Sequence, residues 1–173
     1  LVLLLLVSSC NNIRKNIEDE IMVNLEYELK TIDPALNSSS YGFIYINHAF
    51  EGLLNKDTNN NIIEGVADKW EISEDNLKYT FHLRDDAKWS DGKKVTAGDF
   101  LYPFRRAVNP ETASPMSYLM GYIKNAKDIT RGLKPVQSLG VIAADEKTLI
   151  IELEAPTLYF LDIVASGGVY VPV

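Results

Sequence analysis

Two carboxylates in the segment WSDGKKVTAGDF, residues 89–100, have a spacing that could serve acid–base chemistry. Asp91 and Asp99 lie on either side of a pair of lysines. A catalytic acid pair needs two environments that move the two pKa values apart. Each carboxylate here already has a local structural role, because Asp91-Gly92 is a turn pair and Asp99 occupies the capping-box position of a helix that Thr96 can begin. We therefore interpret this segment as a structural corner and not as a catalytic pair.

The other residues that often carry chemistry are scattered. His48 and His82 lie on different expected elements, and neither has a Cys or a repeated Asp or Glu spacing beside it, so no metal site is predicted. The sequence contains no G-x-S-x-G or H-E-x-x-H motif and no glycine-rich phosphate loop. Trp70 and Trp89 could stack on a ligand, but aromatic anchors of hairpins explain them better. We expect no catalytic residue, no metal ligand and no cofactor.

Length and charge restrict the class of protein. The chain has 173 residues, of which 46% are apolar and 24% charged, which is ordinary for a soluble globular domain. Its formal net charge of −7 lacks the basic footprint of nucleic-acid-binding proteins, so we expect no nucleic-acid partner. The single cysteine, Cys10, can form neither an internal disulfide nor a cysteine metal cluster.

Cys10 instead ends an apolar N-terminal run. Residues 1–7 are all apolar but too few to cross a hydrocarbon core of ~30 Å, and Ser8-Ser9 precede the cysteine. This pattern resembles a bacterial lipobox without its methionine and basic region, so we expect the sequence to begin within a gene product. Residues 1–9 would be the end of a cleaved signal peptide, Cys10 the lipidated mature N-terminus and residues 10–20 a polar tether. The alternative is a buried strand with an incidental cysteine.

The hydrophobic pattern predicts the elements of the N-terminal part. Alternation over residues 21–27 predicts a strand, which Asp33-Pro34 separates from the next element. The polar loop 37–40 can cap an amphipathic helix, expected over residues 41–54. Asn59-Asn60-Asn61 predicts a turn.

The remaining pattern mixes strands and helices. Residues 77–84 alternate most clearly and predict a strand with one apolar face. The corner then leads into a helix that Asn109-Pro110 ends. The further expected elements are a helix over 113–127, a loop over 132–135, a hairpin of 139–143 with 147–153 around Asp145-Glu146, and a short helix after Pro156 that Gly167-Gly168 ends. We expect the chain to be a fragment, because it stops at Val173 within an apolar extended run.

Three stretches in a fixed order carry a resemblance to a known family. They are TIDPALNSSSYGFIYINHAFEGLL, GVADKWEISEDNLKYTFHLRDDAKWSDGKKVTAGDF and DEKTLIIELEAPTLYFL, extended by NPETASP and LGVIAADEKTLIIEL. Together they resemble the bacterial extracellular solute-binding proteins, family 5, which serve ABC importers. The resemblance implies a mixed α/β fold, the N-terminal portion of a two-lobed periplasmic-binding-protein type II fold. Residues 21–50 would form the first segment of lobe one, and residues 51–173 a small accessory domain that flanks it.

The resemblance also implies where a ligand would bind. Family members hold an extended peptide largely through its backbone, with little sequence preference. Contacts are expected after the Asp-Pro corner and after the TASP stretch, at Asn37, Ser38, Ser39, Ser40, Met116 and Tyr118. Relatives often have a Glu-Gly-hydrophobic run at the first place and a tyrosine at the second. This chain has three serines and a methionine there, so the ligand class stays open.

The resemblance predicts a binding protein and not an enzyme. The expected function is that of a lipid-anchored receptor of the cell envelope, facing the periplasm or the extracellular side, which binds oligopeptides and delivers them to an ABC permease. The same scaffold could carry another solute, such as a nickel chelate, haem, a cell-wall peptide or a sugar. A surface hydrolase is a third hypothesis, disfavoured because no nucleophile–base spacing is present.

Overall fold

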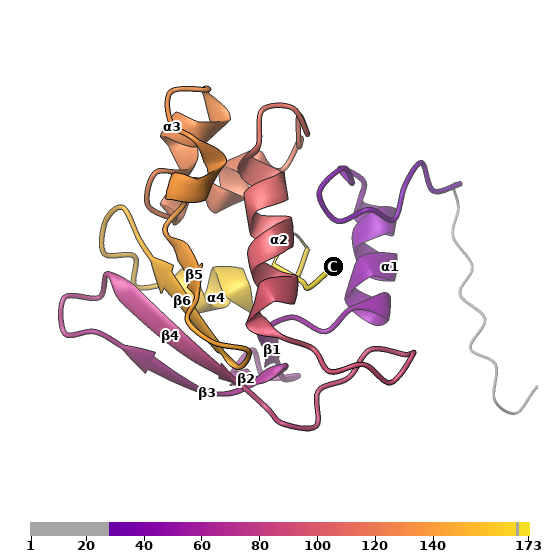
Figure 1. Cartoon of the computed structure of the whole chain (residues 1–173). Helices are drawn as coiled ribbons and strands as arrows, with labels where there is room; N and C mark the ends of the chain where they lie inside the picture. Colours follow the sequence, from indigo (N-terminus) through magenta and orange to yellow (C-terminus); the bar gives the residue numbers. More distant parts are fainter. Residues whose placement is uncertain (1–27, 169) are drawn as a thin grey trace, which may run out of the picture.

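An antiparallel sheet of four strands forms one layer of the molecule, and helices cover one of its faces (Figure 1). The computed structural model describes residues 28–168 and 170–173, so the strand expected over 21–27, the tether and Cys10 lie outside the described residues. The spatial order of the sheet is β3-β4-β6-β5. Its strands are β3 (Ala67–Ile72), β4 (Lys78–Leu83), β5 (Val141–Ala143) and β6 (Thr148–Glu152).

Strand β4 has one buried and one partly exposed face, as the alternation over residues 77–84 predicts. Tyr79 lies opposite Ile151 of β6, and Phe81 lies opposite Leu149, so the buried faces of neighbouring strands coincide. Strands β5 and β6 pair antiparallel, which confirms the expected hairpin. The sheet thus presents a continuous apolar surface to the helices.

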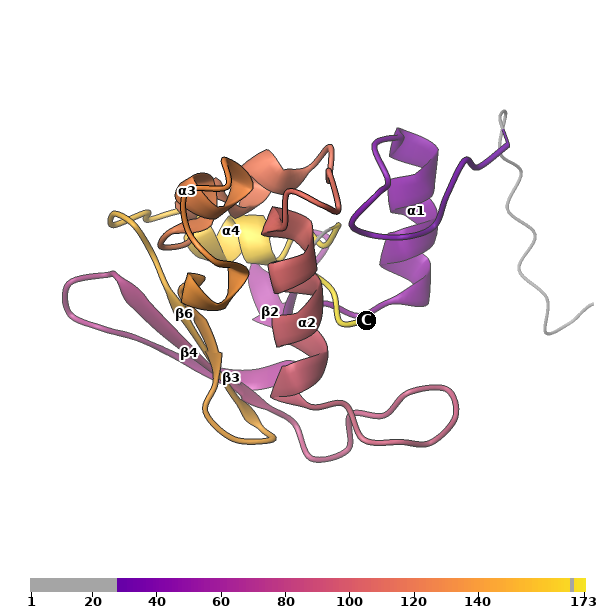
Figure 2. The same ribbon diagram turned by 45° about the horizontal axis from the view of Figure 1, so that its top comes forward.

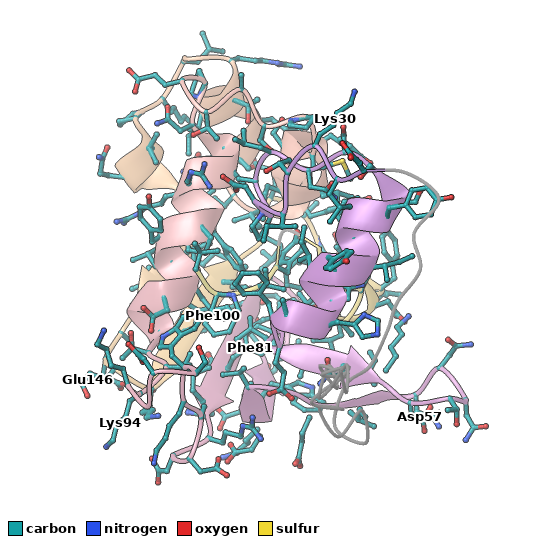
Figure 3. All side chains as sticks on the ribbon, turned by 90° about the vertical axis from the view of Figure 1, so that its right-hand side faces the viewer. Lys30, Asp57, Phe81, Lys94, Phe100 and Glu146 are labelled. Atoms are coloured by element: carbon teal, nitrogen blue, oxygen red, sulfur yellow. The ribbon has the colours of Figure 1, made fainter. Side chains whose placement is uncertain are left out.

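Helix α2 (Ala97–Val108) covers this surface and confirms the helix expected after the corner. Phe100 and Phe104 are fully buried. Figure 3 shows Phe100 of α2 and Phe81 of β4, which belong to the same buried core. The buried side chains of α2 thus pack in the same core as those of the sheet.

Pro103 lies inside α2 and leaves one backbone carbonyl of the helix without its usual partner, which a distant segment supplies. Because proline has no N–H, the helix cannot bond the carbonyl of Asp99 one turn earlier. The N–H of Val173 donates to this carbonyl at 3.0 Å. Tyr170 packs edge-on against Phe104, with ring centroids 5.3 Å apart. The last described residues thus dock on α2, on the side that faces α1 (Figures 1 and 2).

Helix α1 (Ser40–Ala49) is shorter than the helix predicted over residues 41–54, so that prediction is wrong at its C-terminal end. Leu53 and Leu54 are buried, as expected, but Leu53 lies in a bend and Leu54 begins β1. The carbonyl of Leu53 accepts the N–H of Ala67 at 2.9 Å, which pairs this segment with the beginning of β3. The helical spacing arose because apolar residues beyond the end of the helix, Phe50, Leu53 and Leu54, continue its apolar spacing by coincidence.

A two-stranded hairpin follows and confirms the expected asparagine turn. Its strands are β1 (Leu54–Lys56) and β2 (Ile62–Glu64). Asn60 adopts a φ of 63°, a conformation that asparagine tolerates better than most residues. The carboxylate of Asp57 accepts the N–H of Asn61 at 2.8 Å and closes the turn.

The single helix expected over residues 113–127 is wrong. Two short helices occupy this region, η2 (Ser117–Tyr122) and α3 (Ala126–Thr130). Between them Ile123 forms a β-bridge with Leu153, beyond the end of β6, and Asn125 has a φ of 66°. Backbone groups near Ile123 therefore pair with the sheet, so they cannot form the internal hydrogen bonds of a continuous helix.

The short helix expected after Pro156 is confirmed as α4 (Phe160–Val164), and a turn of 3₁₀ helix, η3 (Val136–Ser138), precedes β5. Phe160 links the sheet to the last described segment, because its ring lies 4.9 Å from that of Tyr79 and 6.3 Å from that of Tyr170. Within residues 28–168 and 170–173, no helix combines the length and apolarity needed to cross a membrane.

Candidate functional site

An ion pair joins the segment before α1 to the C-terminal half of α2. Arg106 donates from Nη1 to Asp33 Oδ1 and from Nη2 to Asp33 Oδ2, each at 2.6 Å. Both side chains are 27% exposed, so the pair is only partly screened by solvent. The guanidinium holds the pKa of the Asp33 carboxyl below its usual range, helped by the N–H of Ala35. A bidentate pair of this kind fixes orientation as well as distance.

The loop after Asp33 is held by its own hydrogen bonds. The side chain of Asn37 is buried; its Oδ1 accepts from the N–H of Ser39 at 3.2 Å, and its Nδ2 donates to Ser39 O at 3.1 Å. Ser39 in turn caps α1, because its Oγ accepts the N–H of Gly42 at 3.0 Å. A Cβ built at Gly42 would collide with Asn37 Oδ1. The loop and the first turn of α1 are therefore one packed unit.

The four loop residues that the resemblance implied as ligand contacts fall into two groups, according to whether their side chains bond within the loop or are exposed. Asn37 and Ser39 use their side chains within the loop. Ser38 and Ser40 are exposed. The loop can thus offer a ligand two hydroxyl groups and its outer backbone, while Asn37 acts as its internal support.

The second implied segment follows α2. Ser114 is buried, and its Oγ accepts the N–H of Met116 at 3.3 Å. Met116 is half-buried and packs against the core, whereas Tyr118 is 65% exposed. Tyr118 also lines a groove of about 290 Å³, whose other lining residues are Ser117, Gly121, Lys127, Thr130 and Arg131. Of this segment, Tyr118 is the side chain most available to a ligand.

The Asp33–Arg106 pair brings the two segments to the same end of α2. The loop before α1 lies beside the chain that leaves α2, an arrangement visible from two directions (Figures 1 and 2). Ser38, Ser40 and Tyr118 are the exposed members of the two implied contact segments. In the sequence, Asp33-Pro34 predicts only a break between two elements, and the partner of Asp33 is not predicted. The adjacent arginines at the end of an apolar helix were the available signal, but nothing local identifies which carboxylate they face.

The corner at residues 89–100 has the structure predicted for it. Asp91 accepts the N–H of Lys93 at 3.0 Å, and the Lys93 ammonium at 2.7 Å holds the pKa of Asp91 below its usual range. Gly92 has a φ of 87°, which favours glycine. The Asp99 carboxylate accepts from the N–H of Thr96 at 2.7 Å. Both carboxylates thus serve the turn and the cap, and the lowered pKa of Asp91 is the reverse of what a general acid needs.

The two histidines lie apart. Nδ1 of His48 is 2.7 Å from the carbonyl of Ile44 on its own helix, and His82 Nε2 is 3.5 Å from Glu71 on the neighbouring strand. Among the residues that the structure describes, no three His, Cys, Asp or Glu side chains are grouped so that they could hold a metal ion.

Comparison with known proteins settles the family. The family described as bacterial extracellular solute-binding proteins, family 5 (middle part), matches residues 61–172, more than half of the chain. This chain belongs to that family. Residues 61–172 contain the whole four-stranded sheet and α2, so the family match covers the sheet and the helix that packs on it.

Curated family 5 relatives include several proteins named for peptide binding. The chain is 48% identical to the periplasmic oligopeptide-binding protein OppA of Salmonella typhimurium over 122 residues, 69% of this chain and 22% of the relative. It is 38% identical to the periplasmic murein peptide-binding protein MppA of Escherichia coli, over 86% of this chain and 28% of the relative. The dipeptide-binding protein DppE of Bacillus subtilis is 35% identical, over 90% of this chain and 28% of the relative.

Solved structures agree with the family and the fold. The substrate-binding domain of an oligopeptide ABC transporter from Bacillus anthracis superposes with a TM-score of 0.80 and 41% identity, over 82% of this chain and 27% of that one. Listeria monocytogenes OppA bound to peptide gives 0.79 and 38%, over 82% and 28%. The expected mixed α/β fold of a periplasmic binding protein is confirmed. The chain spans between a fifth and a third of the length of these relatives.

Proposed function

We propose that this chain is part of a receptor that binds oligopeptides outside the cytoplasm and delivers them to an ABC permease. Membership of family 5, with relatives named for oligopeptide, dipeptide and murein peptide binding, is the observation that carries the proposal. A receptor needs no chemical step, so the local structural roles of Asp91 and Asp99 are compatible with this function.

The two segments joined by the Asp33–Arg106 pair would supply this chain's share of the binding site. Ser38 and Ser40 offer hydroxyl groups, and the exposed ring of Tyr118 offers an apolar face with a polar end. A peptide that pairs through its backbone with such segments is bound with little regard to sequence. Because residues 37–40 carry no charge, this loop would not select for a charged ligand terminus.

Attachment to the membrane forms part of the proposal. Cys10 would carry the lipid, and the polar stretch to residue 20 would act as a tether. Two acyl chains are enough for stable anchoring, whereas one chain alone binds only marginally. The receptor would then remain at the membrane that holds its permease, on the periplasmic or extracellular side.

Calorimetry on the full-length protein tests peptide binding. The titrants are a mixed pool of short peptides and, separately, a cell-wall peptide, because the 38% identity to MppA makes murein peptide the best-supported second cargo. We expect saturable heat with the mixed pool. Saturation with the cell-wall peptide alone would replace oligopeptides by murein peptide as the cargo. The absence of binding to either would contradict the proposal.

Turnover assays on generic peptide and ester substrates test the remaining hypothesis. We expect no product above the uncatalysed rate, since a solute-binding protein releases its ligand unchanged. Turnover that survives purification and is lost on substitution of a residue in this chain would favour the hydrolase instead.

A further inference from the structure

Arg105, the neighbour of Arg106 on α2, has no partner in the described part of the chain. Its guanidinium makes no hydrogen bond, ion pair or ring contact with residues 28–168 or 170–173, and its Nε is sealed from solvent. A buried donor without an acceptor costs about 1–3 kcal/mol, and more when it is charged. Because Nε itself is sealed, an acceptor from outside the described residues can reach Arg105 only where the side chain lines a surface groove.

Two cations near Arg105, by contrast, each have a carboxylate partner. Arg106 is held by both carboxylate oxygens of Asp33. Lys124 donates to Glu152 at 2.8 Å. Arg105 lies between them on the seam of α2 with η3 and β5, and it lines a groove on each side.

Among the described residues, Arg105 is the unpartnered cation of both grooves, which differ in their other side chains. The first, of about 370 Å³, includes Lys124 together with its own counter-charge Glu152. The second, of about 310 Å³, is lined by Tyr102, Arg105, Arg106, Asn109, Thr112 and Val136. This second groove, here called the Arg105 groove, combines the guanidinium of Arg105 with amide and hydroxyl groups. Its other guanidinium, that of Arg106, is neutralised by Asp33, and the lining itself contains no carboxylate.

We propose that the Arg105 groove binds a small oxyanion, a carboxylate or a phosphate group. Arg105 would be its main ligand, because two oxygens of such an anion match the planar fork of a guanidinium. Asn109, Thr112 and Tyr102 stand beside it as further donors. The site is separate from Ser38, Ser40 and Tyr118, so it goes beyond the proposed binding of peptide.

A purely structural role for Arg105 makes a different prediction. The residue lies in the last turns of α2, where a cation stabilises a helix through its dipole. In that case removal of the charge lowers stability whether or not an oxyanion is present. If Arg105 is an anion ligand, its removal costs stability only in the presence of the anion, because ligands stabilise the state they bind.

The experiment follows thermal unfolding and calorimetry of the full-length protein. Inorganic phosphate and acetate are titrated separately against chloride at constant ionic strength. The variants are Arg105→Gln, Arg105→Lys, which keeps the charge without the fork, and Lys94→Gln, which removes a charge from the exposed corner at the other end of α2.

We expect a saturable rise in Tm with phosphate or acetate, whichever the groove prefers. Arg105→Gln should weaken that binding at least about tenfold while leaving Tm in chloride unchanged or higher. Arg105→Lys should fall between, and Lys94→Gln should match the wild type. The proposal is overturned if neither anion binds saturably, if Lys94→Gln weakens binding as much, or if Arg105→Gln lowers Tm equally in chloride and in the anion. Because no peptide is present, the result does not depend on the proposed peptide binding.

Discussion

Asp33 and Arg106, which lie far apart in the sequence, face each other with two hydrogen bonds of 2.6 Å. This pair connects the loop before α1 to the helix that covers the sheet. The loop carries Ser38 and Ser40, and α2 leads toward Tyr118. The relative position of the candidate contact segments thus depends on one ion pair that is largely shielded from solvent.

Asp33→Asn should therefore reduce stability and peptide affinity together. The substitution leaves the Arg106 guanidinium partly buried without its counter-charge, at a cost of about 2 kcal/mol. Urea unfolding of the full-length protein measures the stability, and calorimetry measures the affinity. Asp91→Asn is the matched control, because the Asp91–Lys93 pair is exposed and should leave both quantities almost unchanged. Equal effects of the two substitutions would show that the buried pair has no special role.

The same pair predicts a pH dependence. The pKa of Asp33 is lower in the folded chain than in the unfolded one, so between the two values the unfolded state binds more protons and stability rises with pH. The contribution of Asp33 is complete above its unfolded pKa of about 3.9 and is lost as the pH falls through the lower folded value. The stability difference between wild type and Asp33→Asn should be constant from about pH 5 to 7 and shrink below about pH 4. A difference that grows on acidification would contradict this assignment.

Gly42→Ala should destabilise the protein although alanine favours helices. The new Cβ would collide with Asn37 Oδ1, so the buried amide and the Ser39 cap must move. We expect a loss of about 1–3 kcal/mol in urea unfolding. Gly98→Ala, in the first turn of α2, is the control: its Cβ would meet only Thr96 Oγ1, at an ordinary 3.4 Å, and should add up to about 1 kcal/mol. Stabilisation by both substitutions would mean that the loop adapts freely.

Cys10→Ser should release the full-length protein from the membrane fraction into the soluble fraction. The reason is that the serine hydroxyl cannot take up the thioether-linked lipid, so the anchor is lost. Fractionation with immunodetection measures the distribution. Replacement of Ser9 by Ala, a residue of similar size beside the cysteine, should leave the protein in the membrane fraction. Retention of the Cys10→Ser variant there would contradict lipid attachment at this residue.

Elements with a strong local period could be predicted from the sequence. Apolar residues recur at every second position in strand β4 and at helical spacing in α2. Turn or cap residues mark the ends of both elements. Helix α1 was expected to continue to Leu54 because apolar residues beyond its end continue its apolar spacing by coincidence. The helix expected over 113–127 failed because Ile123 pairs with Leu153, a contact that no local pattern contains.

Long-range pairings account for what sequence reasoning missed at the candidate site. Asp33 could be recognised as a turn residue, but its bond to Arg106 depends on how α1 and α2 pack. Asn37 remains a predicted ligand contact, and the bonds of its side chain to Ser39 within its own loop are seen only in the structure. The exposure of Ser38, Ser40 and Tyr118 and the unmatched charge of Arg105 likewise follow only from the folded structure.

Mass spectrometry of the ligand that co-purifies with the full-length protein tests the central claim most directly. The protein is purified without added ligand and denatured, and the released small molecules are identified without prior selection. This openness matters because one 39% identical relative is named a probable deoxycholate-binding protein. Our account predicts a mixture of short peptides of varied sequence. A single non-peptide solute, such as a haem, a nickel chelate, a sugar or a bile acid, recovered in stoichiometric amount would contradict it.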